Sequence, residues 1–190
     1  MEILRNDLSQ FSNPSISEIA NDDVQYALPH EYLALQNELE EIETHMKSLS
    51  DLNHSAMNES SETFHDNAPA EALRDESIVY SSRNRSLLSI LEKIQIIDYP
   101  SEELNFITIG SLVSLQFENG DTEQFYIAGV VNYSKINDPE VTLCSYKSPV
   151  GKLLVGRNVG NKILLDSNKQ TVTILSIRQI GKDSPLIYNN

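Results

Sequence analysis

Apolar residues recur at coiled-coil spacing in two segments of the chain, residues 33–52 and 70–94. In each segment the positions alternate steps of four and three, which places them in one stripe along one face of a helix. Two such stripes joined by a turn can bury each other only as an antiparallel hairpin. At about 1.5 Å per residue, we predict helices on the order of 30 Å or more in length. The first stripe is Leu35, Leu39, Ile42, Met46 and Leu49, and the second is Ala70, Leu73, Ser77, Tyr80, Asn84, Leu87, Leu91 and Ile94.

The first long helix is predicted to begin near residues 28–31. Pro29 suits the first turn of a helix, and Glu31 complements the helix dipole there. The helical periodicity fades after Leu52. Before this helix, residues 1–27 hold too few apolar positions to indicate a packed element. We interpret them as a flexible leader with room for one short helix.

A polar stretch separates the two apolar stripes, and it carries the acids Glu62 and Asp66. Asp66 or Asn67 is the predicted cap of the second helix, because Pro69 is tolerated in a first turn. From the pattern alone, carboxylates in such a turn face solvent or cap a helix start. A second interpretation, that the hairpin presents these carboxylates for chemistry at its end, needs information beyond the local pattern.

The two halves of the chain differ in charge and in glycine content. Residues 1–105 hold 21 Asp and Glu against 6 Lys and Arg, whereas residues 106–190 hold 7 against 8. All 7 glycines lie in the second half. This change predicts two domains after the leader, a helical hairpin at 28–98 and a second domain at 106–180, with a linker near 98–105.

Composition also excludes several classes of protein. The net charge of −14 disfavours binding to bare nucleic acid, because that affinity comes from Lys and Arg neutralising phosphates. Cys144 is the single cysteine, so a disulfide framework is excluded and a reducing cytosol is the expected compartment. The chain has neither a signal-peptide pattern nor an apolar run of the ~18 residues that a membrane span needs. We expect a cytoplasmic protein whose partner is another protein.

Beyond residue 105 the apolar period changes from about 3.6 to 2, which predicts short strands. The turn at 118–121 joins two of them as a hairpin. The segment 148–156 has a serine cap, a first-turn proline and a terminal glycine, so we predict one short helix against a mainly antiparallel sheet. The fold class is therefore α+β. The predicted strands are 107–109, 112–117, 125–127, 141–143, 163–165 and 172–177.

Several short motifs of the second half follow one another in a characteristic order. They are Ile109-Gly110-Ser111-Leu112-Val113, Phe125-Tyr126-Ile127-Ala128-Gly129, Ser148-Pro149 followed by Leu154 and Gly156, and Gly160-Asn161. Together with the hairpin, they make residues 30–180 resemble the Gre family of bacterial transcript-cleavage elongation factors. The resemblance implies an N-terminal antiparallel coiled-coil hairpin and a C-terminal domain of FKBP-like fold.

The resemblance also implies a function. Gre factors insert their coiled coil into the secondary channel of bacterial RNA polymerase, where carboxylates at the tip reach the catalytic centre and the 3′ end of the nascent RNA. On this chain the implied residues are Asp66 and Glu62, which would help to hold a second Mg²⁺ shared with the polymerase, a metal that prefers oxygen ligands. The polymerase then cleaves backtracked RNA. We expect a monomeric accessory factor with no active site and no stably bound cofactor of its own.

The tip departs from the family pattern. Where the family typically reads Asp, Leu, Lys, Glu, Asn, Ala, this chain reads Thr63-Phe64-His65-Asp66-Asn67-Ala68. Asp66 falls on the family's Glu, Thr63 replaces the first acid, and Glu62 lies one residue away. These differences, with Pro69, motivate a first alternative, a non-cleaving regulator or inhibitor that occupies the same channel. A second alternative is a coiled-coil adaptor or chaperone without a role in transcription.

Overall fold

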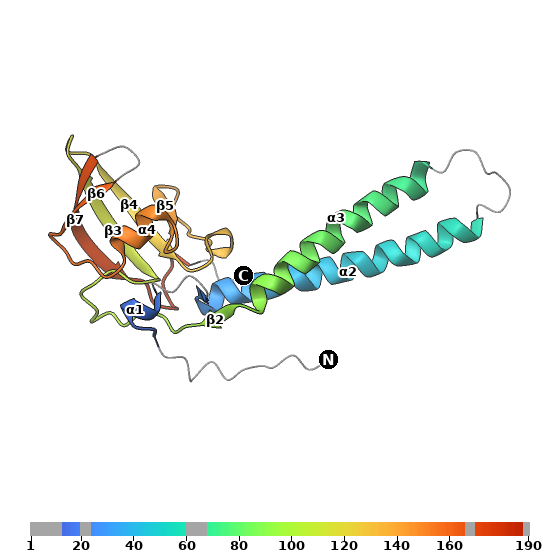
Figure 1. The fold of residues 1–190 in the computed structure, drawn as a ribbon, viewed down its shortest axis with the longest axis horizontal. Helices are drawn as coiled ribbons and strands as arrows, with labels where there is room; N and C mark the ends of the chain where they lie inside the picture. Colours follow the sequence, from blue (N-terminus) through green and yellow to red (C-terminus); the bar gives the residue numbers. More distant parts are fainter. Residues whose placement is uncertain (1–12, 20–23, 60–67, 166–169, 188–190) are drawn as a thin grey trace. The chain divides into compact units, whose positions relative to one another are not determined.

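The computed structural model describes residues 13–19, 24–59, 68–165 and 170–187. The chain divides into two compact units (Figure 1). One is a single excursion of the chain, residues 33–93. The other combines residues 1–32 with residues 94–190. The chain is thus a mixed α+β protein, as predicted, with a sheet-rich C-terminal region.

Two long helices make up the first unit. They are α2, Pro29–Glu59, and α3, Ala68–Leu91. The start of α2 agrees with the predicted start at Pro29, but the helix continues well past Leu52, to Glu59. Helical geometry persists over 53–59 although the apolar period has faded there, because Ala, Met and Glu in this stretch are good helix formers.

The predicted stripes are the more buried positions of α2 and α3. Every stripe position from 35 to 49 and from 73 to 91 is buried or half-buried. Ile78 and Val79, which lie off the stripe of α3, are 59% and 65% exposed. The positions that share the 3.5-residue period therefore form the buried face of each helix, and their packing as a coiled coil stays a prediction.

A five-stranded sheet forms most of the second unit. Its order is β5-β4-β3-β7-β6 (Figure 1). Neighbouring strands are antiparallel except β4 and β5, which are parallel. The sheet therefore matches the prediction of a mainly antiparallel arrangement. The strands are β3, Ser111–Phe117; β4, Thr122–Ala128; β5, Val141–Ser145; β6, Lys162–Leu165; and β7, Gln170–Gln179.

Local signals set two features of this unit. The predicted turn at 118–121 connects β3 to β4, and Gly120 adopts a φ of +90°, a conformation that glycine reaches without strain. The predicted short helix is α4, Pro149–Leu154. Ser148 caps it, with its hydroxyl accepting a hydrogen bond from the Gly151 N–H at 3.0 Å.

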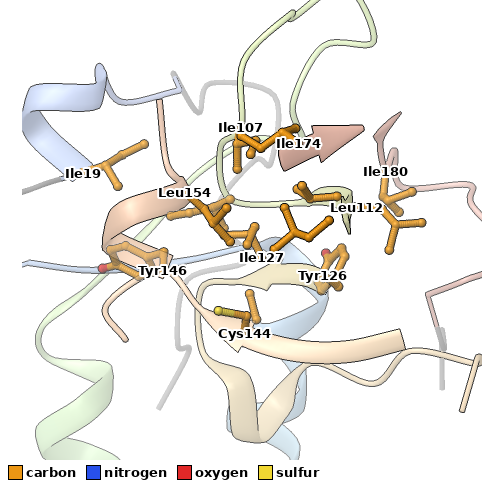
Figure 2. Packing of buried hydrophobic residues seen from close by; sticks show 14 of the residues in the cluster. Ile19, Ile107, Leu112, Tyr126, Ile127, Cys144, Tyr146, Leu154, Ile174 and Ile180 are labelled. Carbon is orange, nitrogen blue, oxygen red and sulfur yellow. The ribbon is translucent and has the colours of Figure 1, made fainter. Parts of the chain in front are cut away.

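One face of the sheet packs against α4 to form the core. Leu154 of α4 is fully buried, together with Ile127 and Ile174 of the sheet (Figure 2). Cys144 lies in the same cluster and has the burial of a small apolar residue. A 3₁₀ turn, η2, Val131–Tyr133, follows β4.

The structure corrects the predicted strand at 107–109. This segment is not a strand, although Ile107 and Ile109 are 0% and 1% exposed. Its backbone groups bond to loops instead, since the Ile107 N–H donates to the Arg157 carbonyl at 2.8 Å and the Ile107 carbonyl accepts from Gly156. Burial produced the apolar pattern, while the Ile107 backbone pairs with the loop at residues 156–157 rather than with a strand.

The described part of the 1–27 segment differs from a flexible leader. It contains α1, Ile16–Ile19, and β1, Gln25–Ala27, which pairs in parallel with β2, Ile94–Ile96. Figure 2 shows Ile19 beside the core cluster, where it is 5% exposed. A few apolar residues suffice because Ile19 and Tyr26 are part of the core cluster of the sheet-rich unit.

Tyr146 binds the backbone of the N-terminal segment at residues 24–26. Its hydroxyl accepts a hydrogen bond from the Tyr26 N–H at 3.0 Å and donates to the Val24 carbonyl at 3.2 Å. Gln25 adds a hydrogen bond from its side-chain amide to the Gly129 carbonyl at 2.7 Å. The segment is therefore an integral part of the second unit.

Candidate functional site

The predicted tip lies between α2 and α3 in the chain. Two side-chain contacts define how these two helices are aligned. The Arg83 guanidinium lies 2.7 Å from a carboxylate oxygen of Glu38. The His45 Nε2 lies 3.0 Å from a carboxylate oxygen of Glu76, and the His45 ring packs on Tyr80 with centroids 4.2 Å apart. Residue numbers fall along one helix as they rise along the other, so α2 and α3 run antiparallel.

Helix α2 ends at Glu59, and α3 begins at Ala68. The predicted site residues, Glu62 and Asp66, fall in this interval and lie outside the described residues. The structure therefore defines the helices that carry the tip, and the placement of the two carboxylates stays a prediction.

Exposed charge dominates the sides of the helix pair. Glu40, Glu41 and Glu43 are exposed on α2, whereas Arg74 and Arg85 are exposed on α3. The Arg85 side chain donates to the Ser81 carbonyl at 3.3 Å, one turn earlier on its own helix. No group of three or more His, Cys, Asp or Glu with the geometry of a metal site occurs among the described residues.

A buried carboxylate, which the sequence analysis treated only as a dipole partner, organises the start of α2. Glu31 is 0% exposed. Its carboxylate accepts hydrogen bonds from three backbone N–H groups, those of Leu28 at 2.9 Å, Gly129 at 3.0 Å and Val130 at 3.1 Å. The Ser134 hydroxyl donates a fourth, short hydrogen bond.

Leu28 is the N-cap of α2, since its carbonyl accepts the first hydrogen bonds of the helix. In a capping box, a glutamate three positions after the N-cap accepts a hydrogen bond from the N-cap N–H, and Glu31 does so with Leu28. Burial raises the pKa of the Glu31 carboxyl, and its four hydrogen bonds oppose that effect. The position of Glu31, three residues after the N-cap, could have indicated its hydrogen bond to Leu28. The sequence could not indicate that residues 129–134, about 100 positions further along, supply the other donors.

The neighbouring His30 is held neutral. Burial lowers its pKa to about 4. Its Nδ1 lies 3.0 Å from the Tyr99 hydroxyl, and the two rings stack with centroids 5.8 Å apart. Burial also raises the pKa of Tyr99 to about 12, so the phenol stays protonated and can donate to Nδ1. His30 Nε2 and the Tyr126 hydroxyl are buried atoms for which the described residues provide no hydrogen-bond partner.

These observations define a class of protein, an antiparallel pair of long helices joined to a sheet-rich α+β unit. None of its described helices is both long enough and apolar enough to cross a membrane. Residues 101–179 match the family described as "Transcription elongation factor, GreA/GreB, C-term".

Relatives extend the similarity into the helix pair. Transcription elongation factor GreA of Bacillus anthracis is 28% identical over 147 residues, which cover 76% of this chain and 90% of the relative. GreA of Oenococcus oeni is 29% identical over 116 residues, covering 59% and 69%. GreB of Haemophilus influenzae is 28% identical over 92 residues, covering 48% and 56%.

A solved structure of GreA factor homolog 1 (Gfh1) from Thermus thermophilus is 22% identical, with a TM-score of 0.39, and covers 82% of this chain and 99% of its own. Residues 101–179 thus match the GreA/GreB C-terminal family, and most of the chain is similar to GreA transcription elongation factors. The resemblance inferred from the sequence is confirmed.

Proposed function

We propose that this protein is an accessory factor that binds bacterial RNA polymerase and stimulates the polymerase's own cleavage of backtracked RNA. The observation that carries the proposal is the family match at residues 101–179, extended by similarity to GreA over 147 residues. The factor would act in the cytoplasm, where the polymerase works. It would contribute no active site of its own.

The helix pair is the proposed finger. With 31 residues in α2 and 24 in α3, the helices are roughly 45 Å and 35 Å long at 1.5 Å per residue. That length suits entry into the secondary channel of the polymerase as an antiparallel coiled coil. Packing of the two stripes against each other would stiffen the finger as a coiled coil.

Asp66 and Glu62 are the proposed carboxylates of the tip. When bound beside them in the polymerase, a second Mg²⁺ would supply charge stabilisation for phosphoryl chemistry at the RNA 3′ end. Two carboxylates match the oxygen donors that this metal prefers. The residues of this chain would orient the ion and neighbouring water, while the polymerase supplies the reacting centre.

The C-terminal unit is the proposed docking domain. Its mainly antiparallel sheet with one short helix is the composition that an FKBP-like interpretation requires. Residues 106–190, which form its sheet, are close to neutral in net charge, in contrast to the acidic residues 1–105. We infer that this unit binds at the rim of the channel and that the helix pair enters it.

Transcript cleavage by purified backtracked complexes tests this proposal. Wild-type protein should accelerate release of short RNA from the 3′ end, and Asp66→Asn should reduce that acceleration by about tenfold or more, since it removes a charged metal ligand. Glu62→Gln measures whether Glu62 replaces the missing acid at position 63. Asp75→Asn, an exposed acid on α3, is the matched control and should act like wild type.

One specific observation favours a second function. Thr63 stands where the family carries an acid, so the tip has lost one ligand in register. Polymerase binding without any cleavage stimulation would favour the non-cleaving regulator. Absence of polymerase binding would contradict both and leave the adaptor or chaperone.

A further inference from the structure

A groove of about 840 Å³ opens on the second unit, between residues 98–102 and residues 177–184. Its first wall carries two carboxylates, Asp98 and Glu102, and its second wall carries Arg178, Lys182 and Asp183. All five are exposed. The groove therefore presents acids on one wall and mainly bases on the other.

These charges are available to a partner. Among the described residues, none of the five forms an ion pair with another. Asp98 accepts a hydrogen bond from the Tyr99 N–H, which orients its side chain without neutralising it. A ligand that brings opposite charges to both walls would gain ion pairs without first breaking any within the groove.

The second wall is preformed. The Ile180 N–H donates to the Gly110 carbonyl at 3.0 Å, and the Asn137 N–H donates to the Leu186 carbonyl at 2.9 Å. Ile180 and Ile187 are 2% and 4% exposed. Because the backbone on both sides of Lys182 is anchored, a partner would not have to order this wall on binding.

The groove lies at the border of the family match. That match covers residues 101–179 and so excludes Asp98, Lys182 and Asp183. Glu102 and Arg178 lie inside the matched region. The family match therefore covers only part of the charged lining of the groove.

The chemistry selects one class of ligand. Three carboxylates against two cations disfavour nucleic acid, whose binding depends on an excess of positive charge. A protein segment can carry a Lys or Arg and an Asp or Glu a few residues apart and match both walls. We propose that this groove is a docking site for such a segment of RNA polymerase, in addition to the contacts made by the helix pair. This proposal rests on the polymerase binding proposed above.

The test measures the affinity of the full-length protein for purified core RNA polymerase at two salt concentrations. One variant reverses the basic wall, Arg178→Glu with Lys182→Glu, and another reverses the acidic wall, Asp98→Lys with Glu102→Lys. Each should weaken binding about tenfold, and less so at high salt, because both walls contribute screened ion pairs.

Two controls carry the same change in net charge at exposed positions away from the groove. They are Lys135→Glu with Lys162→Glu, and Glu118→Lys with Glu140→Lys. Both should bind within about twofold of wild type. A photoreactive residue at position 102 should crosslink to a polymerase subunit, and the same residue at position 140 should not.

The outcomes separate the two proposals. Wild-type binding that neither wall reversal weakens overturns the groove and leaves the proposed function standing. Weaker binding on reversal of the basic wall with stronger binding on reversal of the acidic wall indicates a nucleic-acid ligand and also overturns it. No binding by wild type overturns the proposed function, and the groove proposal fails with it.

Discussion

The Glu31 carboxylate accepts a hydrogen bond from the Gly129 N–H at 3.0 Å, across 98 positions of the chain. The same carboxylate caps the first turn of α2 through the Leu28 N–H at 2.9 Å. One buried side chain thus satisfies the backbone at a helix start and at the loop that follows β4. Its removal would leave several buried donors unpaired at once.

We expect Glu31→Ala to lower the free energy of unfolding by about 3 kcal/mol, because unpaired buried donors each cost on the order of 1–3 kcal/mol. Urea unfolding followed by circular dichroism measures the change. Glu41→Ala, an exposed glutamate on the same helix, is the control and should stay within about 0.5 kcal/mol of wild type. Equal stability of the two variants would contradict the bridging role of Glu31.

Gly129 is predicted to tolerate no side chain. A Cβ at this position would lie 2.5 Å from a carboxylate oxygen of Glu31 and 2.5 Å from the Tyr26 carbonyl oxygen. Gly129→Ala should therefore destabilise the protein by roughly 1–3 kcal/mol through overpacking. Gly181→Ala is the matched control, since a Cβ there meets nothing within 4 Å. Thermal unfolding of the two variants should show a lower Tm for the first alone.

His30 should make the protein sensitive to acid. Its folded-state pKa of about 4 lies below the unfolded value of 6.5, so the unfolded chain binds a proton first as pH falls. The contribution of neutral His30 is present above pH 6.5 and is lost as pH falls toward 4. The raised pKa of Glu31 acts in the opposite sense, because that carboxyl takes up its proton more readily in the folded state.

Replacing His30 with Gln isolates this effect. The variant keeps a polar side chain beside Tyr99 but cannot titrate, so its stability should fall less than that of wild type between pH 6.5 and 4.5. Between pH 6.5 and 4.5, the free energy of unfolding of wild type should fall by on the order of 2 kcal/mol more than that of the variant. Urea unfolding at a series of pH values measures it, and parallel profiles for the two proteins would count against a neutral buried His30.

Two adjacent leucines on α3 test the helix packing. Leu87 is 0% exposed and Leu88 is 42% exposed. Leu87→Ala should cost about 2–4 kcal/mol through lost burial and a cavity, whereas Leu88→Ala should cost less than about 1 kcal/mol. Helicity followed by circular dichroism during thermal unfolding separates the two. Similar losses for both would mean that the stripe is not the packing face.

Much of the fold was predictable because its signals are local. The period of the leucine-rich stripes identified α2 and α3 and their contact face, with Leu35 and Leu87 both fully buried. Ser148 and Pro149 marked the start of α4 for reasons of hydrogen bonding and backbone geometry. The prediction of a strand at 107–109 was wrong because the backbone of the buried Ile107 bonds to the loop at residues 156–157. An apolar pattern does not identify the partner of a backbone N–H.

Of the candidate site, the sequence identified the acids Glu62 and Asp66 and the helices that carry them. Their spacing in the chain says nothing about the distance between their oxygens, so their chemistry depends on the cleavage experiment. The groove beside Asp98 was not predictable, because its walls come from segments almost 80 residues apart whose proximity arises only on folding.

The sequence by itself determined the helix pair, the change to strands beyond residue 105 and the charge of each half, since periodicity, turn chemistry and ionisation are properties of nearby residues. Only the tertiary structure decided that the Glu31 carboxylate binds the loop at residues 129–134, that Ile19 joins the core and that residues 177–184 lie beside residues 98–102. Each depends on hydrogen bonds or side-chain contacts between distant segments. Local propensity does not predict such pairs, because the contacts stabilise the fold only after the chain has closed the long loop between the two segments.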